Sequence, residues 1–247
     1  MTRGPSRPTA TGSDGGVGRP VTPGAADHQH EGTGTGESMQ IRPLAPELLA
    51  EELAERIAAL PGPWARVAVD GADAARPGEL ADALVAPLRL RGRPVQRVHA
   101  RDFLRPASLR FEFGRQDADA YLDRWLDAGA LFREVFDPLE PGGSGLVLPT
   151  LWDAATDRAT RAERVPLPPG GVLLLDGPLL LGRWFPLDLT VHLHLSPAAL
   201  ERRTAPEQHW TLPALARYEA EQQPQQAADM TVRADDPRRP ALVVSDT

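Results

Sequence analysis

Large apolar side chains recur at helical spacing at the start of the region that we expect to fold. Leu49, Leu53 and Ile57 lie four residues apart, and Pro46 suits the first turn of a helix. A Pro-Gly-Pro sequence at 61–63 ends this amphipathic pattern. The spacing therefore predicts a helix that begins at Pro46 and ends before the Pro-Gly-Pro sequence.

Short apolar runs alternate with amphipathic stretches along the rest of the chain. Strands are predicted at 66–69, 94–100, 172–175, 189–195 and 230–233, and helices at 78–88, 127–136, 197–203 and 212–223. Two further stretches, 146–152 and 162–167, predict a small β-hairpin or lid. Strands that alternate with helices favour an α/β fold in which helices flank a parallel sheet. Because ligands bind at the carboxyl ends of such strands, we expect the chemistry in the turns after Val69, Val98 and Leu175.

Residues 1–38 differ in composition from the rest of the chain. They are rich in Gly, Pro, Ser and Thr, so they cannot bury enough apolar surface to offset the entropy of ordering. We expect a disordered tail at 1–38 and one folded domain at 39–247. No apolar run approaches the roughly 20 residues of a membrane span, and the N-terminus has no apolar signal segment. These features predict a cytoplasmic protein without a membrane partner.

Charge and missing residue types exclude several kinds of chemistry. The net charge of -7 argues against a general nucleic-acid-binding protein, since phosphate contacts need a basic surface. The chain has no cysteine, which excludes disulfides, thiolate zinc sites and cysteine nucleophiles. It also has no lysine, because all 27 basic residues are arginine. A lysine ammonium therefore takes no part in any reaction here, although an arginine fork can grip phosphate with two hydrogen bonds.

The turn after the first predicted strand has the length of a phosphate-binding loop but not its side chains. A working P-loop reads G-x-x-x-x-G-K-[ST]: the second glycine lets the backbone wrap the phosphates, the lysine reaches the β- and γ-phosphates, and the hydroxyl holds Mg²⁺. Counted from Gly71, these three positions are Arg76, Pro77 and Gly78. Pro77 also lacks a backbone N–H that could bind an anion. The loop is thus predicted to be a remnant anion cradle without its cation and its metal-anchoring hydroxyl.

The order of several segments resembles the uridine kinases, a family of P-loop kinases. The segments are Val-Ala-Val-Asp-Gly at 67–71, Arg-Asp-Phe at 101–103, Gly-Arg-Gln-Asp at 114–117, the stretch 127–139 that ends in Asp-Pro-Leu, Leu-Leu-Leu-Asp-Gly at 173–177 and Ala-Asp-Met-Thr-Val at 228–232. The resemblance covers roughly residues 64–244 and points to a divergent, actinobacterial-type relative. It implies a P-loop NTPase-type sheet, and it implies phosphorylation of the 5′-hydroxyl of uridine or cytidine with ATP and Mg²⁺.

The resemblance also implies roles for individual residues. The phosphate-binding positions are Gly71, Ala74, Ala75, Arg76, Gly78, Glu79, Arg202 and Arg203. The nucleoside-binding positions are Arg115, Tyr121 and Asp127. Asp176 follows an apolar strand and would hold Mg²⁺. The catalytic base of the family falls on Arg101, so the neighbouring Asp102 is the candidate that remains.

Each of these assignments competes with an ordinary structural role. Asp102 and Asp127 could cap a helix or a turn, and Asp176 could belong to a strand-terminal Asp-Gly turn. The arginines at 202–203 could lie on a solvated helix face. Separately, two histidines at 192 and 194 share one face of a predicted strand and could bind a metal, but no third ligand is evident and a packed pair is expected.

Three functions remain open at this point. The chain could be an ATP-dependent nucleoside kinase with a divergent loop, or a catalytically inactive relative that acts as a nucleotide sensor or a protein-interaction module. It could also be an unrelated α/β domain. The substituted loop positions favour impaired turnover, since each lost phosphate contact weakens transition-state stabilisation. A nucleoside or nucleotide is the expected small-molecule partner, and a homo-oligomer or another protein partner is left open.

Overall fold

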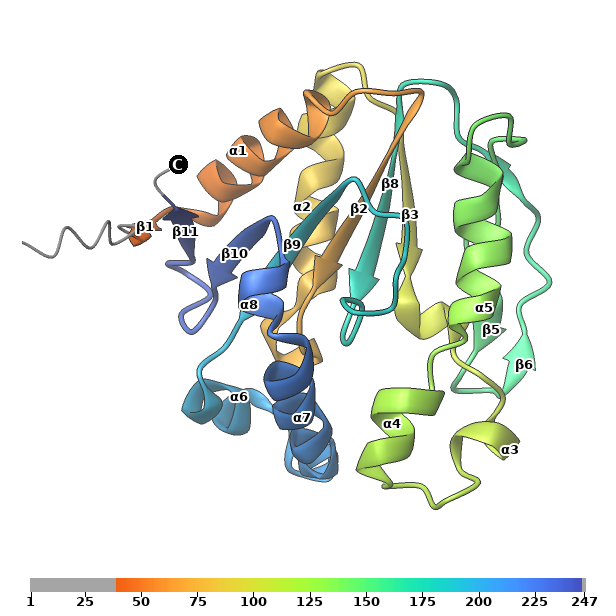
Figure 1. Cartoon of the computed structure of the whole chain (residues 1–247), viewed down its shortest axis with the longest axis vertical. Helices are drawn as coiled ribbons and strands as arrows, with labels where there is room; N and C mark the ends of the chain where they lie inside the picture. Colours follow the sequence, from red (N-terminus) through yellow and green to blue (C-terminus); the bar gives the residue numbers. More distant parts are fainter. Residues whose placement is uncertain (1–38, 246–247) are drawn as a thin grey trace, which may run out of the picture. The chain divides into compact units, whose positions relative to one another are not determined.

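A seven-stranded sheet forms the centre of the domain in this computed structural model, which describes residues 39–245 (Figure 1). The predicted disordered tail at 1–38 lies outside the described residues. The strand order is β1-β11-β10-β9-β2-β8-β3. The strands are β1 (Met39–Pro43), β2 (Trp64–Asp70), β3 (Val95–His99), β8 (Gly171–Gly177), β9 (Leu189–His194), β10 (Met230–Arg233) and β11 (Ala241–Ser245). From β10 to β3 all neighbours are parallel, so the predicted parallel sheet is confirmed.

Helices cover both faces of the sheet, as the prediction of an α/β fold requires. Alternate residues of a strand point to opposite faces, so Val67 and Val69 pack in one apolar cluster with helices α1 (Pro46–Ala58) and α2 (Pro77–Leu90). Ala68 belongs to a second cluster, which contains α5 (Ala128–Leu131). The predicted helix at 127–136 continues beyond α5 as a π-helical turn and then a 3₁₀ turn that ends at Leu139.

The carboxyl ends of the parallel strands face a group of short helices. These are α3 (Ala107–Arg110), α4 (Ala118–Arg124), α6 (Pro197–Arg203) and α7 (Leu212–Gln222), with a 3₁₀ helix at Pro206–Thr211 between α6 and α7. A further short helix, α8 (Pro224–Ala227), leads from α7 into β10. In Figure 1 the strand arrows run toward the lower part of the view, where α3 and α4 lie on one side and α6 and α7 on the other. The edge at which ligands are expected is therefore walled from two directions.

The insertion between α5 and β8 is more divided than the predicted hairpin. β4 (Leu146–Val147) pairs with β7 (Val165–Pro166), and β5 (Trp152–Asp153) pairs with β6 (Arg158–Ala159), all antiparallel. Pro149 lies between β4 and β5 and cannot donate to a strand ladder, which explains the break.

Sequence patterns missed several elements, among them the antiparallel strands β1 and β11 and the helices α3, α4 and α8. β1 contains Pro43 and only one strongly β-forming residue, Ile41, so it carries little local signal. Within residues 39–245, no helix combines the length and the apolar composition that crossing a bilayer requires.

Candidate functional site

The loop after β2 lies at the carboxyl edge of the sheet, as predicted. The Gly71 N–H donates to the Gly177 carbonyl at 3.2 Å, which ties the loop to the end of β8. A Cβ at Gly71 would lie 2.9 Å from the Cβ of Leu193 on β9, closer than carbon atoms pack. Glycine is therefore required here by the close approach of β9.

The loop itself is a tight 3₁₀ turn over Asp73–Ala75. Its Ala75 N–H donates to Ala72 at 2.7 Å, and the Arg76 N–H donates to Asp73 at 3.0 Å. Arg76 adopts left-handed backbone angles, φ 61° and ψ 54°, which glycine adopts most easily. The position that corresponds to the second P-loop glycine thus keeps a glycine-like backbone. However, the N–H groups of Ala75 and Arg76 already donate hydrogen bonds within the turn, and Pro77 has no N–H to offer an anion.

Asp176, the predicted Mg²⁺ ligand, is buried at the end of β8 and already paired. It forms an ion pair with Arg97, and the Nδ1 atom of His99 lies 2.9 Å from its Oδ1. Its Oδ2 is 3.2 Å from where a Cβ at Gly78 would lie, so it does sit beneath the loop. Mg²⁺ demands several oxygen ligands in a near-octahedral shell. The Asp176 carboxylate is paired with the Arg97 guanidinium, and the loop has Gly78 where a P-loop has a hydroxyl that binds Mg²⁺. This arrangement does not fit Mg²⁺.

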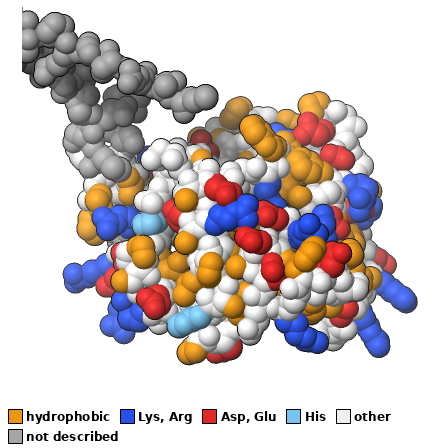
Figure 2. Space-filling view, turned by 60° about the horizontal axis from the view of Figure 1, so that its bottom comes forward, with side chains coloured by type: hydrophobic (Ala, Val, Ile, Leu, Met, Phe, Trp, Pro, Cys, Tyr) orange, Lys and Arg blue, Asp and Glu red, His pale blue; other side chains and the backbone are white. Residues whose placement is uncertain are grey.

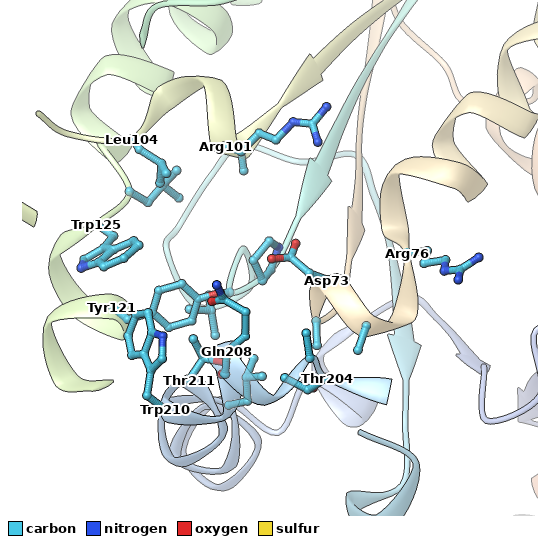
Figure 3. A pocket seen from close by; sticks show the side chains of 18 of the residues that line it. Asp73, Arg76, Arg101, Leu104, Tyr121, Trp125, Thr204, Gln208, Trp210 and Thr211 are labelled. Atoms are coloured by element: carbon cyan, nitrogen blue, oxygen red, sulfur yellow. The ribbon is translucent and has the colours of Figure 1, made fainter. Parts of the chain in front are cut away.

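A cavity of about 630 Å³ opens beside the loop, between α4 and the segment that joins α6 to α7. One wall is aromatic: ring centroids of Tyr121 and Trp125 are 5.3 Å apart, those of Tyr121 and Trp210 are 5.5 Å apart, and those of Trp125 and Trp210 are 5.3 Å apart. Figure 3 shows these three rings grouped with Leu104 on one side of the cavity. The wall offers flat apolar faces to a ligand.

Polar groups from several segments also line the cavity. Asp73 and Arg101 line the cavity, as do Gln208 and the hydroxyl-bearing residues Thr204 and Thr211 (Figure 3). Desolvation raises the pKa of Asp73, and the charge of Asp176 adds to that rise, while Arg101 opposes it. The cavity therefore combines a large apolar face with a few donors and acceptors, which is the usual make-up of a small-molecule site.

The structure brings together some of the sequence-predicted site residues. Ala74, Arg76, Arg101, Tyr121 and Arg203 all line the cavity. In Figure 3 the Arg76 guanidinium points away from the aromatic wall, and it pairs with Glu79 at 3.2 Å. Burial lowers the pKa of Arg203, and the positive charges of Arg76 and Arg202 add to that effect.

Other predicted residues lie elsewhere. Asp127 caps α5, accepting a hydrogen bond from the Ala130 N–H at 2.9 Å, which is the structural role left open for it. Arg115 lies with its guanidinium 5.2 Å from the centroid of the Phe111 ring, outside the residues that line the cavity. Arg202 is exposed and does not line the cavity either.

Asp102 opens toward a second cavity of about 480 Å³ under the β5–β6 hairpin, together with Asp153 and Thr160. Desolvation raises the pKa of Asp102, while His99 and Arg101 lower it. Arg101 lines both cavities, whereas Asp102 is absent from the lining of the aromatic one. A base role for Asp102 would thus require its side chain to turn toward the aromatic cavity.

Sequence reasoning missed Trp125, Trp210 and the acidic partner network of Arg97. The two tryptophans are 85 positions apart in sequence and no local motif connects them. The residue type itself could have indicated them, because only 5 of the 247 residues are tryptophan. A buried or half-buried tryptophan often lines a binding site.

Comparison with known proteins places the fold but not the activity. No protein-family model matches the sequence, and no curated protein matches it. Among solved structures, a possible uridine kinase from Bacillus stearothermophilus matches with a TM-score of 0.60 and 19% identity, over 74% of this chain and 96% of that one. A proposed fructose transport system kinase from Silicibacter sp. TM1040 matches with a TM-score of 0.51 and 22% identity, over 75% of this chain and 95% of that one. The chain therefore shares its fold with these two structures.

Proposed function

We propose that this protein binds a nucleoside-like ligand in the aromatic cavity and transfers phosphate from ATP slowly or not at all. The observation that carries the proposal is the pairing of Asp176 with Arg97 and His99, beneath a loop that has neither lysine nor hydroxyl. The kinase-fold neighbours support a nucleotide-related ligand, and the cavity lies at the sheet edge where such folds bind their substrates.

Binding of a planar base is supported by the aromatic wall. Stacking of a base on an aromatic side chain contributes about 1–3 kcal/mol. Tyr121, Trp125 and Trp210 form such a wall, and a cavity of about 630 Å³ is within the range that holds drug-sized ligands. Asp73 and Gln208 could accept or donate hydrogen bonds to a sugar or to the base edge.

Impaired transfer is supported by what surrounds the phosphate position. Kinase chemistry is mostly positioning and charge stabilisation, supplied by the loop backbone, a cation and Mg²⁺. Removing one well-placed charge-stabilising donor typically costs about 10²–10³ in rate. This chain lacks the lysine, and its Asp176 carboxylate is ion-paired with Arg97. The N–H groups of Ala75 and Arg76 donate hydrogen bonds within the turn.

A slow but genuine kinase is the second candidate. Arg76 and Arg203 line the same cavity as Asp73, and each could bind a phosphate chain once its guanidinium leaves its present partner. That partner is Glu79 for Arg76 and the Ala234 carbonyl for Arg203. In that case Asp102 would be the base, and Asp176 would have to exchange Arg97 for Mg²⁺. In the first case the protein would serve as a nucleotide sensor or as an interaction module that responds to its ligand.

The test pairs ligand titration with a turnover assay. Thermal shift and calorimetry with uridine, cytidine, fructose and ATP–Mg²⁺ are run on the wild type, on Trp210→Ala and on Trp184→Ala. Trp184 is the matched control, since its side chain is 92% exposed and it does not line the cavity. We expect a nucleoside to bind the wild type and Trp184→Ala, with at least a tenfold loss in Trp210→Ala, and we expect negligible phosphorylated product.

Two results would change the conclusion. Sustained ATP-dependent formation of nucleoside or sugar phosphate that disappears in Asp102→Asn would establish the kinase. Equal binding by Trp210→Ala and the wild type, or no response to any of these ligands, would remove the aromatic cavity as the site.

A further inference from the structure

Two histidines and a glutamate converge next to the phosphate loop but outside the aromatic cavity. His192 and His194 lie on the same face of β9, and Glu219 reaches them from α7. The distance from His192 Nε2 to Glu219 Oε1 is 3.4 Å, and that from His194 Nδ1 to the same oxygen is 3.9 Å. One donor atom from each residue lies within 4.8 Å of the other two. The third ligand that sequence spacing did not reveal is thus supplied by α7.

Both imidazole nitrogens are buried without a well-formed hydrogen bond. Among the described residues, His192 Nε2 and His194 Nδ1 have no hydrogen-bond partner of normal geometry, although both face the Glu219 carboxylate. The His192 side chain is only 3% exposed. Leaving a buried polar atom unsatisfied costs about 1–3 kcal/mol, so the arrangement calls for something between the three groups.

The remaining contacts orient His192 as metal-bound histidines are oriented. Its Nδ1 lies 2.7 Å from Asp70 Oδ2. Asp70 is fully buried and is itself fixed by the Leu180 N–H at 2.9 Å and the Tyr218 hydroxyl at 3.0 Å. A carboxylate that accepts a hydrogen bond from one ring nitrogen leaves the lone pair of the other nitrogen directed at the metal. Asp70 does this for Nε2, which faces Glu219.

We propose that His192 Nε2, His194 Nδ1 and the Glu219 carboxylate bind a divalent transition-metal ion, with zinc as the first choice and water in the fourth position. Zinc–nitrogen and zinc–oxygen distances are about 2.0–2.2 Å, so two ligands of one tetrahedral ion are about 3.4 Å apart. The His192–Glu219 distance of 3.4 Å already matches, and the 3.9 Å between His194 and Glu219 has to close by about 0.5 Å. The two imidazole nitrogens lie within 4.8 Å of each other and have to approach by up to about 1.4 Å. Imidazole ligands favour zinc, copper, nickel or iron over Mg²⁺ and Ca²⁺.

Solvent access suits an open coordination position. His194 and Glu219 are partly exposed, while His192 closes the buried side. The ion would join β9 to α7, and α7 together with the 3₁₀ helix before it carries four residues of the cavity wall, Gln208, Trp210, Thr211 and Leu215. The site would therefore fix that wall without contacting a ligand in the cavity.

A proton on His192 is the alternative to a bound metal ion. Desolvation lowers the pKa of His192, but its hydrogen bond with Asp70 and the nearby carboxylate of Glu219 outweigh that effect and raise the pKa to about 9. A proton on His192 would then pair with Glu219 in place of a metal. Metal and proton compete for the same nitrogen, because only the neutral imidazole is a ligand.

The experiment uses the full chain, stripped with a chelator and titrated with Zn²⁺ by calorimetry and with Co²⁺ by visible absorption. The wild type is compared with His194→Gln, Glu219→Gln and the control His209→Gln, whose histidine is exposed and stands apart from the cluster. We expect one equivalent of metal, tetrahedral Co²⁺ absorption and a zinc-dependent rise in Tm in the wild type and in His209→Gln. His194→Gln and Glu219→Gln should bind at least tenfold more weakly.

X-ray absorption of the zinc-loaded wild type gives a readout that does not depend on the variants. Two imidazole ligands and additional oxygen ligands are expected. The proposal is overturned by a wild type that shows neither Co²⁺ absorption nor a zinc-dependent Tm. It is equally overturned by metal binding that persists unchanged in both His194→Gln and Glu219→Gln, or by a zinc spectrum with fewer than two imidazoles.

Discussion

The pairing of Arg97 with Asp176 should be measurable as a coupling in stability. Arg97→Met removes the guanidinium but keeps most of the apolar stem, and it leaves Asp176 buried with His99 as its remaining partner. The side chains of Arg97 and Asp176 are 14% and 7% exposed, so the pair is largely shielded from solvent. Breaking one side of a buried pair costs about 3–5 kcal/mol, and the surviving His99 contact places our expectation near 3 kcal/mol.

The matched comparison is Asp82, the other carboxylate that pairs with Arg97. Its side chain is 72% exposed, so Asp82→Asn should lose less than about 1 kcal/mol. Urea denaturation followed by circular dichroism measures all variants, including Asp176→Asn and the double variant Arg97→Met/Asp176→Asn. The double variant should be more stable than the sum of the single losses predicts, with a coupling of at least about 1 kcal/mol.

A coupling close to zero would refute the reasoning, because it would mean that Arg97 does not neutralise Asp176. A functional readout follows from the same change. Once Arg97 is gone, millimolar Mg²⁺ should raise the Tm of Arg97→Met and leave that of the wild type unchanged. Mg²⁺ stabilisation of the wild type would show that the carboxylate is free for the metal after all.

Three further variants test the loop and its surroundings. Gly71→Ala places a Cβ 2.9 Å from that of Leu193 and should cost about 1–3 kcal/mol in urea denaturation, and a neutral result would contradict the close approach of β9. Arg76→Gly relieves a left-handed backbone and should raise stability by up to about 1 kcal/mol, whereas a clear loss would show that the Arg76 side chain matters more than its backbone angles. Burial raises the pKa of Asp102, so the folded state holds that proton more tightly than the unfolded chain and loses stability as pH rises through the raised pKa. Asp102→Asn should therefore increase Tm at neutral pH and lose this advantage below about pH 3.5. An equal gain in Tm at both pH values would exclude titration of Asp102 as the cause.

The sequence could predict the sheet and its ligand-binding edge because both depend on local patterns. Apolar runs identify buried parallel strands, and the end of each run marks the edge where loops meet. This reasoning placed the loop at Gly71 and the carboxylate of Asp176 side by side. The left-handed backbone at Arg76 also agrees with the position of a glycine in a working P-loop.

Partnerships between distant segments could not be read from the same patterns. Arg97 neutralises Asp176 from the neighbouring strand. The sequence alone does not distinguish this arginine from one that faces solvent. The aromatic wall joins α4 to the segment after α6, and Glu219 completes the histidine pair from a helix 25 positions further along the chain. Such contacts depend on how helices pack over the strand ends, which spacing within one element does not determine.

The pairing of β1 with β11 has a consequence for how the domain can be rewired. Met39 is the register partner of Ser245, so the chain enters and leaves the sheet at one outer border, with β11, β10 and β9 between that border and β2. Domains whose first and last strands pair in this way usually tolerate circular permutation. A short linker between these two strands, with new ends opened in the surface insertion near β5 and β6, should preserve the parallel core and leave the loop after β2 unaltered.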